Sequence, residues 1–395
     1  MAQTGNNERL PSLQSLKGMA ALMVFFSHAL GMCRSEYISA FRGTCLNFFV
    51  DGQCAVVLFL CLTGFFTYKE KELNVPSYKT QVLKKAIRIY TPYILVTIIA
   101  WIIANLDIAY EASCFSDWCN TFWQNPISFS YLIKALLLVV PFDPIILNSP
   151  VWYIQVDMRM AFVIPFIVYL LYSIGRLRLI VLSAIIIACA VVKPPLGLMF
   201  YTYYGGGHFL RIVFTHNWRW CKKVFEGRYR FGLLLLGVIL LDWFNIVGIP
   251  ESVASGWMRV FQVIGSMMIV GFFYSNSISL YNKTFLCLGN ISYEFYLVHF
   301  VVLLSLRSLN LSIILYILLA LSTSLIIAFF FKRIITVPVS NYLISKFVSR
   351  LKFRPALLRL LYQLGLFLEL RLFCKLIRDN HYRILKDFFL NRRIY

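Results

Sequence analysis

The chain has 395 residues, of which 60% are hydrophobic, and its mean hydropathy is +0.73. A soluble domain of this length cannot bury so much apolar surface, whereas a helical bundle in a bilayer leaves its outer face to the lipid. The formal net charge of +21 suits a nucleic-acid-binding protein, but the placement of the charges along the chain argues against that class.

Apolar segments long enough to cross a bilayer, which takes about 20 helical residues, recur along the chain. Backbone polar groups in lipid must be paired within their own segment, so helices are expected. We therefore predict an all-α, polytopic bundle of about ten transmembrane spans. Their approximate ranges are 13–32, 46–67, 90–106, 152–174, 178–192, 196–214, 231–248, 258–275, 285–306 and 311–331. A further apolar stretch, 131–140, is too short to cross and is predicted to be re-entrant or interfacial.

The lysine and arginine residues predict how these spans are oriented. With the amino terminus inside, 31 of the 38 basic residues fall in cytoplasmic stretches. The positive-inside rule then places both termini in the cytoplasm, together with the loop that contains Lys222 and Lys223. This bias accounts for the positive charge, and we expect membrane lipids and no nucleic acid as partners.

Two parts are predicted: a membrane domain at 1–335 and a basic, amphipathic cytoplasmic tail at 336–395. Within the tail, the apolar stretch 356–377 also carries Arg359, Glu369, Arg371 and Lys375. That mixture is typical of a helix lying on the anionic inner leaflet rather than crossing it.

The outer loops hold four cysteines, Cys33, Cys45, Cys114 and Cys119, and 107–130 is the only outer loop of substantial length. Four cysteines allow three pairings, and four free thiols are an equally good interpretation. The first apolar segment has no small-residue cleavage site after it, so we expect no cleavable signal peptide.

Ionisable side chains inside a span are costly in lipid, so each is a candidate functional residue. Lys17 and His28 are 11 residues apart, about three helical turns, and therefore share one face of the first span. Lys17 lies near the inner surface and His28 in the outer half, where an imidazole can act as a general base. The alternatives are a snorkelling lysine and a histidine that only packs between helices.

Three basic residues, Lys84, Lys85 and Arg88, precede the third span at its cytoplasmic mouth. They can bind phosphate groups, although such residues are more often topology anchors.

Two further spans place polar groups at the depth of His28. The fourth span begins outside at Trp152 and then carries Asp157 and Arg159, and the ninth contains Tyr293 and, in its outer half, His299. Helix rise then predicts that His28, Asp157 and His299 share one level near the outer side.

These segments together resemble the membrane acyltransferase-3 family, the integral-membrane O-acyltransferases of cell-surface glycans. Residues 13–28 resemble its Leu-Asp-Gly-Leu-Arg segment followed by ten residues and His, with Lys17 for Arg. Residues 59–65, 85–92 and 152–165 resemble three further motifs, and 288–299 is the closest match, to Leu-Gly-x-x-Ser-Tyr-x-x-Tyr-Leu-x-His. The departures are Gln14 and Val57, which stand where the family has or often has Asp, and lysine for arginine at Lys17 and Lys85.

The resemblance implies transfer of an acyl group, most often acetyl, from cytoplasmic acyl-CoA to a hydroxyl of an extracytoplasmic or lipid-linked glycan. The plasma (inner) membrane is then the expected location, and no metal is expected. By the same resemblance, the catalytic residues are His28 and Asp157, the donor-binding residues are Lys17, Lys84, Lys85 and Arg88, and the acceptor-binding residues are Trp152, Arg159, Tyr293 and His299. Other interpretations of the same charges are a transporter or flippase for a glycan precursor, and a glycan polymerase or ligase.

Overall fold

The computed structural model describes residues 11–33, 44, 46–67, 75–106, 115–138, 145–192, 197–243, 245, 256–276, 282–309 and 311–348. Within these ranges the chain is helical throughout, apart from turns and one antiparallel bridge between Cys33 and Phe115. The chain divides into two units, Met1–Ile344 and Ser345–Tyr395, and the site lies in the first.

Seven helices of the described part are long and apolar enough to cross a membrane. They are α1 (Pro11–Met32), α5 (Val75–Asn105), α8 (Val151–Ser173), α9 (Arg178–Val192) together with the 3₁₀ turn that precedes it, α14 (Gly256–Ser275), α15 (Lys283–Leu306) and α16 (Ile313–Phe331). Three other expected spans correspond to shorter helices, namely α4 (Gly52–Thr67), α10 (Tyr201–His216) and α12 (Arg230–Leu241). The described part of this multi-pass membrane protein is thus all-α, and the number of crossings and the side of each terminus remain predictions.

Several short helices connect these elements. They are α3 (Asn47–Val50), α6 (Asp117–Asn120), α7 (Phe129–Leu136) and α11 (Trp218–Phe225), and the 3₁₀ turns are η2 (Gly175–Leu177), η3 (Leu198–Phe200) and η4 (Arg307–Leu309). α7 covers most of the stretch predicted not to cross, and its eight residues reach only ~12 Å.

The predicted boundary between the membrane domain and the tail, at residue 335, falls within a continuous helical run. α16 continues through a π-helical segment, Lys332–Thr336, into α17 (Val337–Val348), so no break in the helix occurs at that boundary. The predicted surface helix at 356–377 lies outside the described residues, as do Cys45 and Cys114.

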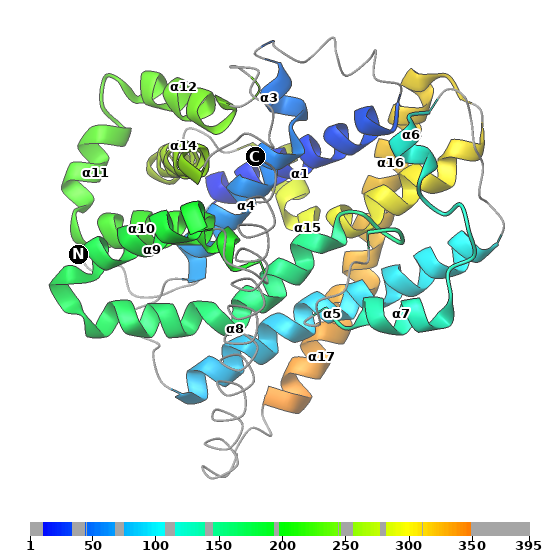
Figure 1. Ribbon diagram of the computed structural model, residues 1–395, viewed down its shortest axis with the longest axis horizontal. Helices are drawn as coiled ribbons and strands as arrows, with labels where there is room; N and C mark the ends of the chain where they lie inside the picture. Colours follow the sequence, from blue (N-terminus) through cyan, green and yellow to red (C-terminus); the bar gives the residue numbers. More distant parts are fainter. Residues whose placement is uncertain are drawn as a thin grey trace, which may run out of the picture. The chain divides into compact units, whose positions relative to one another are not determined.

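In the ribbon, α1, α4 and α15 lie centrally, with α9, α10, α12 and α14 to one side and α5, α7 and α16 to the other (Figure 1). α1 and α15 pack along each other in the same direction, because the Ser15 hydroxyl reaches the Asn282 carbonyl at the start of α15 and the two histidines meet further along.

Two glycines allow α1 and α15 to approach closely. A Cβ at Gly289 would overlap the Gln14 carbonyl oxygen, and a Cβ at Gly18 would overlap that of Phe285. Small residues at such crossings are how membrane helices bring their backbones together. His28 lies ten residues after Gly18 and His299 ten residues after Gly289, so both histidines rise by the same ~15 Å from the crossing.

A second close crossing joins α4 to α10. A Cβ at Gly64 would overlap the Tyr204 carbonyl oxygen, and a Cβ at Gly207 would overlap that of Cys61. This contact fixes α10 against the bundle and thereby positions the Tyr204 side chain.

Candidate functional site

The two predicted histidines face each other. His28 Nδ1 lies 2.9 Å from His299 Nε2, and their rings are 5.2 Å apart and nearly parallel. His299 is 1% exposed, whereas His28 is only partly buried. His28 is therefore the accessible member of the pair and His299 the enclosed one.

The remaining hydrogen bond of His299 assigns the protons of the pair. His299 Nδ1 lies 3.1 Å from the Phe295 carbonyl oxygen, which only accepts, so Nδ1 carries a proton. In a neutral imidazole the other nitrogen then has a lone pair, and His299 Nε2 accepts from His28 Nδ1. This arrangement leaves the lone pair of His28 on Nε2, where it can take a proton from a hydroxyl.

Aromatic side chains enclose the accessible histidine. Trp118 of α6 stacks on His28 with the ring centroids 6.2 Å apart, and Phe300 packs edge-on at 5.3 Å. α6 is attached to the end of α1, because Ser116 Oγ donates to the Gly31 carbonyl at 2.7 Å and caps α6 at its own start. The loop that carries α6 therefore covers His28.

Asp157, predicted to be catalytic and to share one level with both histidines, pairs instead with a lysine and a tyrosine. Asp157 Oδ1 accepts from Lys85 Nζ at 2.9 Å and from the Tyr204 hydroxyl at 2.7 Å. Among the described residues, Asp157 has no hydrogen bond or ion pair to His28 or His299.

This pairing has a physical reason in the length of α5. α5 begins at Val75, so Lys85 is its eleventh residue and lies within the long helix, where its side chain is 23% exposed. A lysine at that depth needs a counter-ion, and Asp157 on α8 supplies it.

A run of aromatic contacts connects the two polar centres. Tyr153 lies one turn before Asp157 on α8, and its ring is 5.4 Å from that of Tyr296, which is 5.8 Å from His299. Phe59 of α4 packs on both tyrosines. This aromatic layer therefore runs from the helical turn before Asp157 to the imidazole pair.

The other predicted donor-binding residues, Lys17, Lys84 and Arg88, differ in their burial and in their partners. Lys17 Nζ lies over the Phe66 ring at 4.8 Å from its centroid, Lys84 is partly buried, and Arg88 is exposed. Lys17 and Lys85 thus already have protein partners, whereas Arg88 presents its guanidinium to the surroundings.

The predicted acceptor-binding residues lie on two helices, α8 and α15, and have different partners. Trp152 packs against Phe200 at 5.4 Å between ring centroids, and Arg159 is partly buried on α8. The Tyr293 hydroxyl donates to the Ile89 carbonyl at 2.9 Å and so ties α15 to α5. Of the four residues, only His299 contacts the imidazole of His28.

A model of an acyltransferase domain family matches residues 10–333, which is most of the chain. The chain belongs to the acyltransferase-3 family. It is therefore a membrane acyltransferase, as the order of its motifs predicts. Comparison with curated proteins and with solved structures gives no match.

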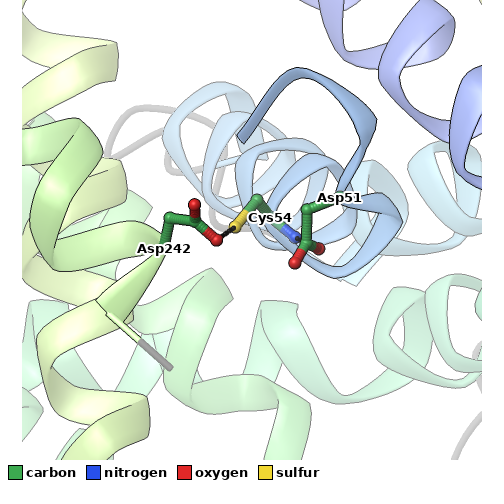
Figure 2. A group of neighbouring side chains, drawn as sticks. All are labelled: Asp51, Cys54 and Asp242. Atoms are coloured by element: carbon green, nitrogen blue, oxygen red, sulfur yellow. Dashed lines mark hydrogen bonds between the residues drawn. The ribbon is translucent and has the colours of Figure 1, made fainter. Parts of the chain in front are cut away.

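The acyltransferase also holds a group that sequence reasoning did not single out, where α4 begins and α12 ends (Figure 2). Asp51, Cys54 and Asp242 bring possible metal-ligand atoms within 4.8 Å of one another. Their atoms already have partners: the Cys54 amide donates to Asp51 Oδ1 at 2.9 Å, and Asn245 Nδ2 donates to both carboxylates. Asp242 lies inside a predicted span, and this intramembrane charge is the signal that could have found the group.

The sequence of this acyltransferase also did not identify Tyr204 as a site residue. Its segment, Tyr-Thr-Tyr-Tyr-Gly-Gly-Gly-His, is rich in tyrosine, but tyrosine is common in membrane helices and gives no specific signal. Only the crossing of α4 and α10 brings its hydroxyl to Asp157.

Proposed function

We propose that this acyltransferase moves an acyl group, most simply acetyl, from cytoplasmic acyl-CoA to a hydroxyl of an extracytoplasmic or lipid-linked glycan. Its place would be the cell membrane, the plasma membrane or a bacterial inner membrane. The observation that carries the proposal is the imidazole pair, because its proton arrangement leaves a basic nitrogen on the partly exposed His28.

His28 is the catalytic residue in this proposal. Its Nε2 takes the proton of the acceptor hydroxyl while the oxygen attacks the thioester carbonyl. The new C–O bond forms, the C–S bond breaks, and His28 returns the proton to the departing thiolate, so the products are the ester and free CoA. His299 holds the His28 ring through Nδ1 and stabilises the imidazolium that forms, which is the role a carboxylate has in hydrolytic triads.

The donor approaches from the cytoplasmic side. Arg88 and Lys84, with Lys17, contact the phosphates of acyl-CoA as charge-assisted donors. Lys85 stays paired with Asp157 and places a neutral, hydrogen-bonded pair beside the aromatic layer of Phe59, Tyr153 and Tyr296. The acyl end of the donor lies along that layer towards His28. Asp157 is then a positioning residue for Lys85 and Tyr204.

The acceptor approaches from the outer side, where Trp118 stacks on His28. An indole face is a usual platform for the apolar face of a sugar ring. Trp152 and Arg159 contribute to acceptor binding at the outer part of α8, and Tyr293 acts by fixing α15 to α5.

The test is acyl transfer by the purified protein in detergent, with radiolabelled acetyl-CoA and a glycan extract from the cells of origin. His28→Ala should lower the rate by about 10²- to 10⁴-fold, the usual contribution of a general base, while acetyl-CoA binding is retained. Transfer at the wild-type rate by His28→Ala would exclude His28 as the base. Binding of acetyl-CoA is measured separately by calorimetry. If the wild-type protein does not bind acetyl-CoA, the proposal that acyl-CoA is the donor is wrong.

A further inference from the structure

Arg307 is a buried arginine that has no counter-ion among the described residues. It lies in η4 directly after α15, is 2% exposed, and is among the largest fully buried side chains. Its one hydrogen bond in the described part of the chain runs from Nη1 to the Cys119 carbonyl at 3.2 Å, and its Nε has no partner. That carbonyl is already shared, because the Phe122 amide donates to it at 3.2 Å.

The guanidinium has five N–H donors and a full positive charge, but its one acceptor is a carbonyl oxygen that it shares with a backbone amide. A buried charge is tolerated when an opposite charge and further hydrogen bonds compensate it. No carboxylate of the described residues forms an ion pair with Arg307. The missing partner is an anion with oxygen atoms that match the fork of the guanidinium, which is a carboxylate or a phosphate.

Arg307 lies close to the imidazole pair. Cys119, whose carbonyl it contacts, directly follows Trp118, which stacks on His28. Along α15, Arg307 is eight residues beyond His299, ~12 Å of helix rise towards the predicted outer side. Asn120, which follows Cys119 in α6, has a buried Oδ1 without a hydrogen-bond partner among the described residues, and this oxygen can accept from a ligand hydroxyl.

We propose that Arg307 binds an anionic group, carboxylate or phosphate, of the molecule that receives the acyl group, so that the acceptor is an acidic glycan. This proposal rests on the proposed function, because it takes the outer side of His28 as the acceptor side. A lipid headgroup is a poorer occupant, since the side chain is enclosed by α6 and α15 and not turned to the bundle surface.

Binding is tested without any acyl transfer, so that failure of the proposed function does not decide the result. The melting temperature of the purified protein in detergent is measured at constant ionic strength with glucuronate, glucose 1-phosphate, inorganic phosphate or glucose. Either sugar anion should raise Tm above the value in glucose, because a ligand that binds only the folded state stabilises it. The two sugar anions distinguish a carboxylate from a phosphate as the recognised group.

Arg307→Gln should abolish the shift caused by the sugar anion, and Arg307→Lys, which keeps the charge but not the fork, should reduce it. Arg259→Gln is the matched control, because Arg259 also donates from Nη1 to a backbone carbonyl, that of Ala190 at 2.9 Å, but is only partly buried. That variant should keep the shift. If Arg307→Gln does not fold, Arg307→Lys alone carries the comparison.

Transfer kinetics give the second measurement. Arg307→Lys should raise KM for an acidic acceptor by about tenfold and leave KM for acetyl-CoA unchanged. The proposal is overturned if the sugar anions give no shift, if the shift persists in both Arg307 variants, or if inorganic phosphate alone shifts Tm as much as the sugar anions.

Discussion

At the scale of single residues, two histidines of different exposure have different roles in the site. His28 is partly exposed and has its lone pair on Nε2, while His299 is 1% exposed and fixed by the Phe295 carbonyl. The same two side chains in exchanged positions would place the basic nitrogen inside the bundle. Burial of one imidazole and access to the other therefore decide which of them can meet a substrate.

His299 acts through His28 in this arrangement, and variants can show it. His299→Gln keeps an oxygen that accepts from His28 Nδ1, whereas His299→Leu has none. We expect His299→Leu to lower kcat by about 10²-fold with little change in KM for acetyl-CoA, and His299→Gln to recover about a tenth of the wild-type kcat or more. Initial rates against acetyl-CoA concentration give both constants. Equal losses in the two variants would mean that His299 only fills space.

The ion pair of Lys85 and Asp157 joins two residues that were predicted to lie apart. Asp157 and Lys85 were assigned to opposite ends of a reaction path, the acceptor side and the donor side, yet they lie 2.9 Å apart. Each side chain neutralises the charge of the other, which offsets the cost of burying both. Neither charge is therefore free to form an ion pair with a substrate.

At the scale of elements, the crossing of α1 and α15 produces the imidazole pair. The glycines of the crossing lie ten residues before the histidines on both helices, and the helices run in the same direction. A wider crossing would separate the imidazoles even if neither helix changed its fold.

Gly289→Ala tests this link. Its Cβ would overlap the Gln14 carbonyl oxygen, so the helices must move apart, at a cost of about 1–3 kcal/mol in the free energy of unfolding. We expect a lower melting temperature and a lower transfer rate. Gly232→Ala in α12 is the matched control, because no atom lies within 4 Å of its added Cβ. Similar behaviour of the two variants would show that the close crossing is not needed.

At the scale of the whole molecule, orientation in the membrane decides which side supplies each substrate. α11 is short and combines exposed Trp218 and Trp220 with basic residues, while Cys221 and Phe225 are buried. Tryptophan and lysine at a helix of this kind are typical of a membrane interface. The charge distribution predicts that this interface is the cytoplasmic one.

Labelling in intact cells tests the predicted orientation. A membrane-impermeant maleimide should label Asn125→Cys, in the loop predicted to be outside, and should label Lys223→Cys only after permeabilisation. Both positions are exposed, and the unmodified protein gives the background from its own cysteines. Labelling of Lys223→Cys in intact cells would reverse the orientation and with it the sides of donor and acceptor.

The sequence by itself determined the class, the family and most of the helices, because the bilayer demands long apolar segments and the family motifs keep their order along the chain. It also identified both histidines, since an ionisable group in lipid is unusual wherever it points. Depth along a helix follows from residue number, and for His28 and His299 that was sufficient. Only the tertiary structure decided which faces meet, because rotation about a helix axis depends on the neighbouring helices. That is why the partner of Asp157, the role of Tyr204 and the burial of Arg307 away from any carboxylate of the described residues emerged only from the packed bundle.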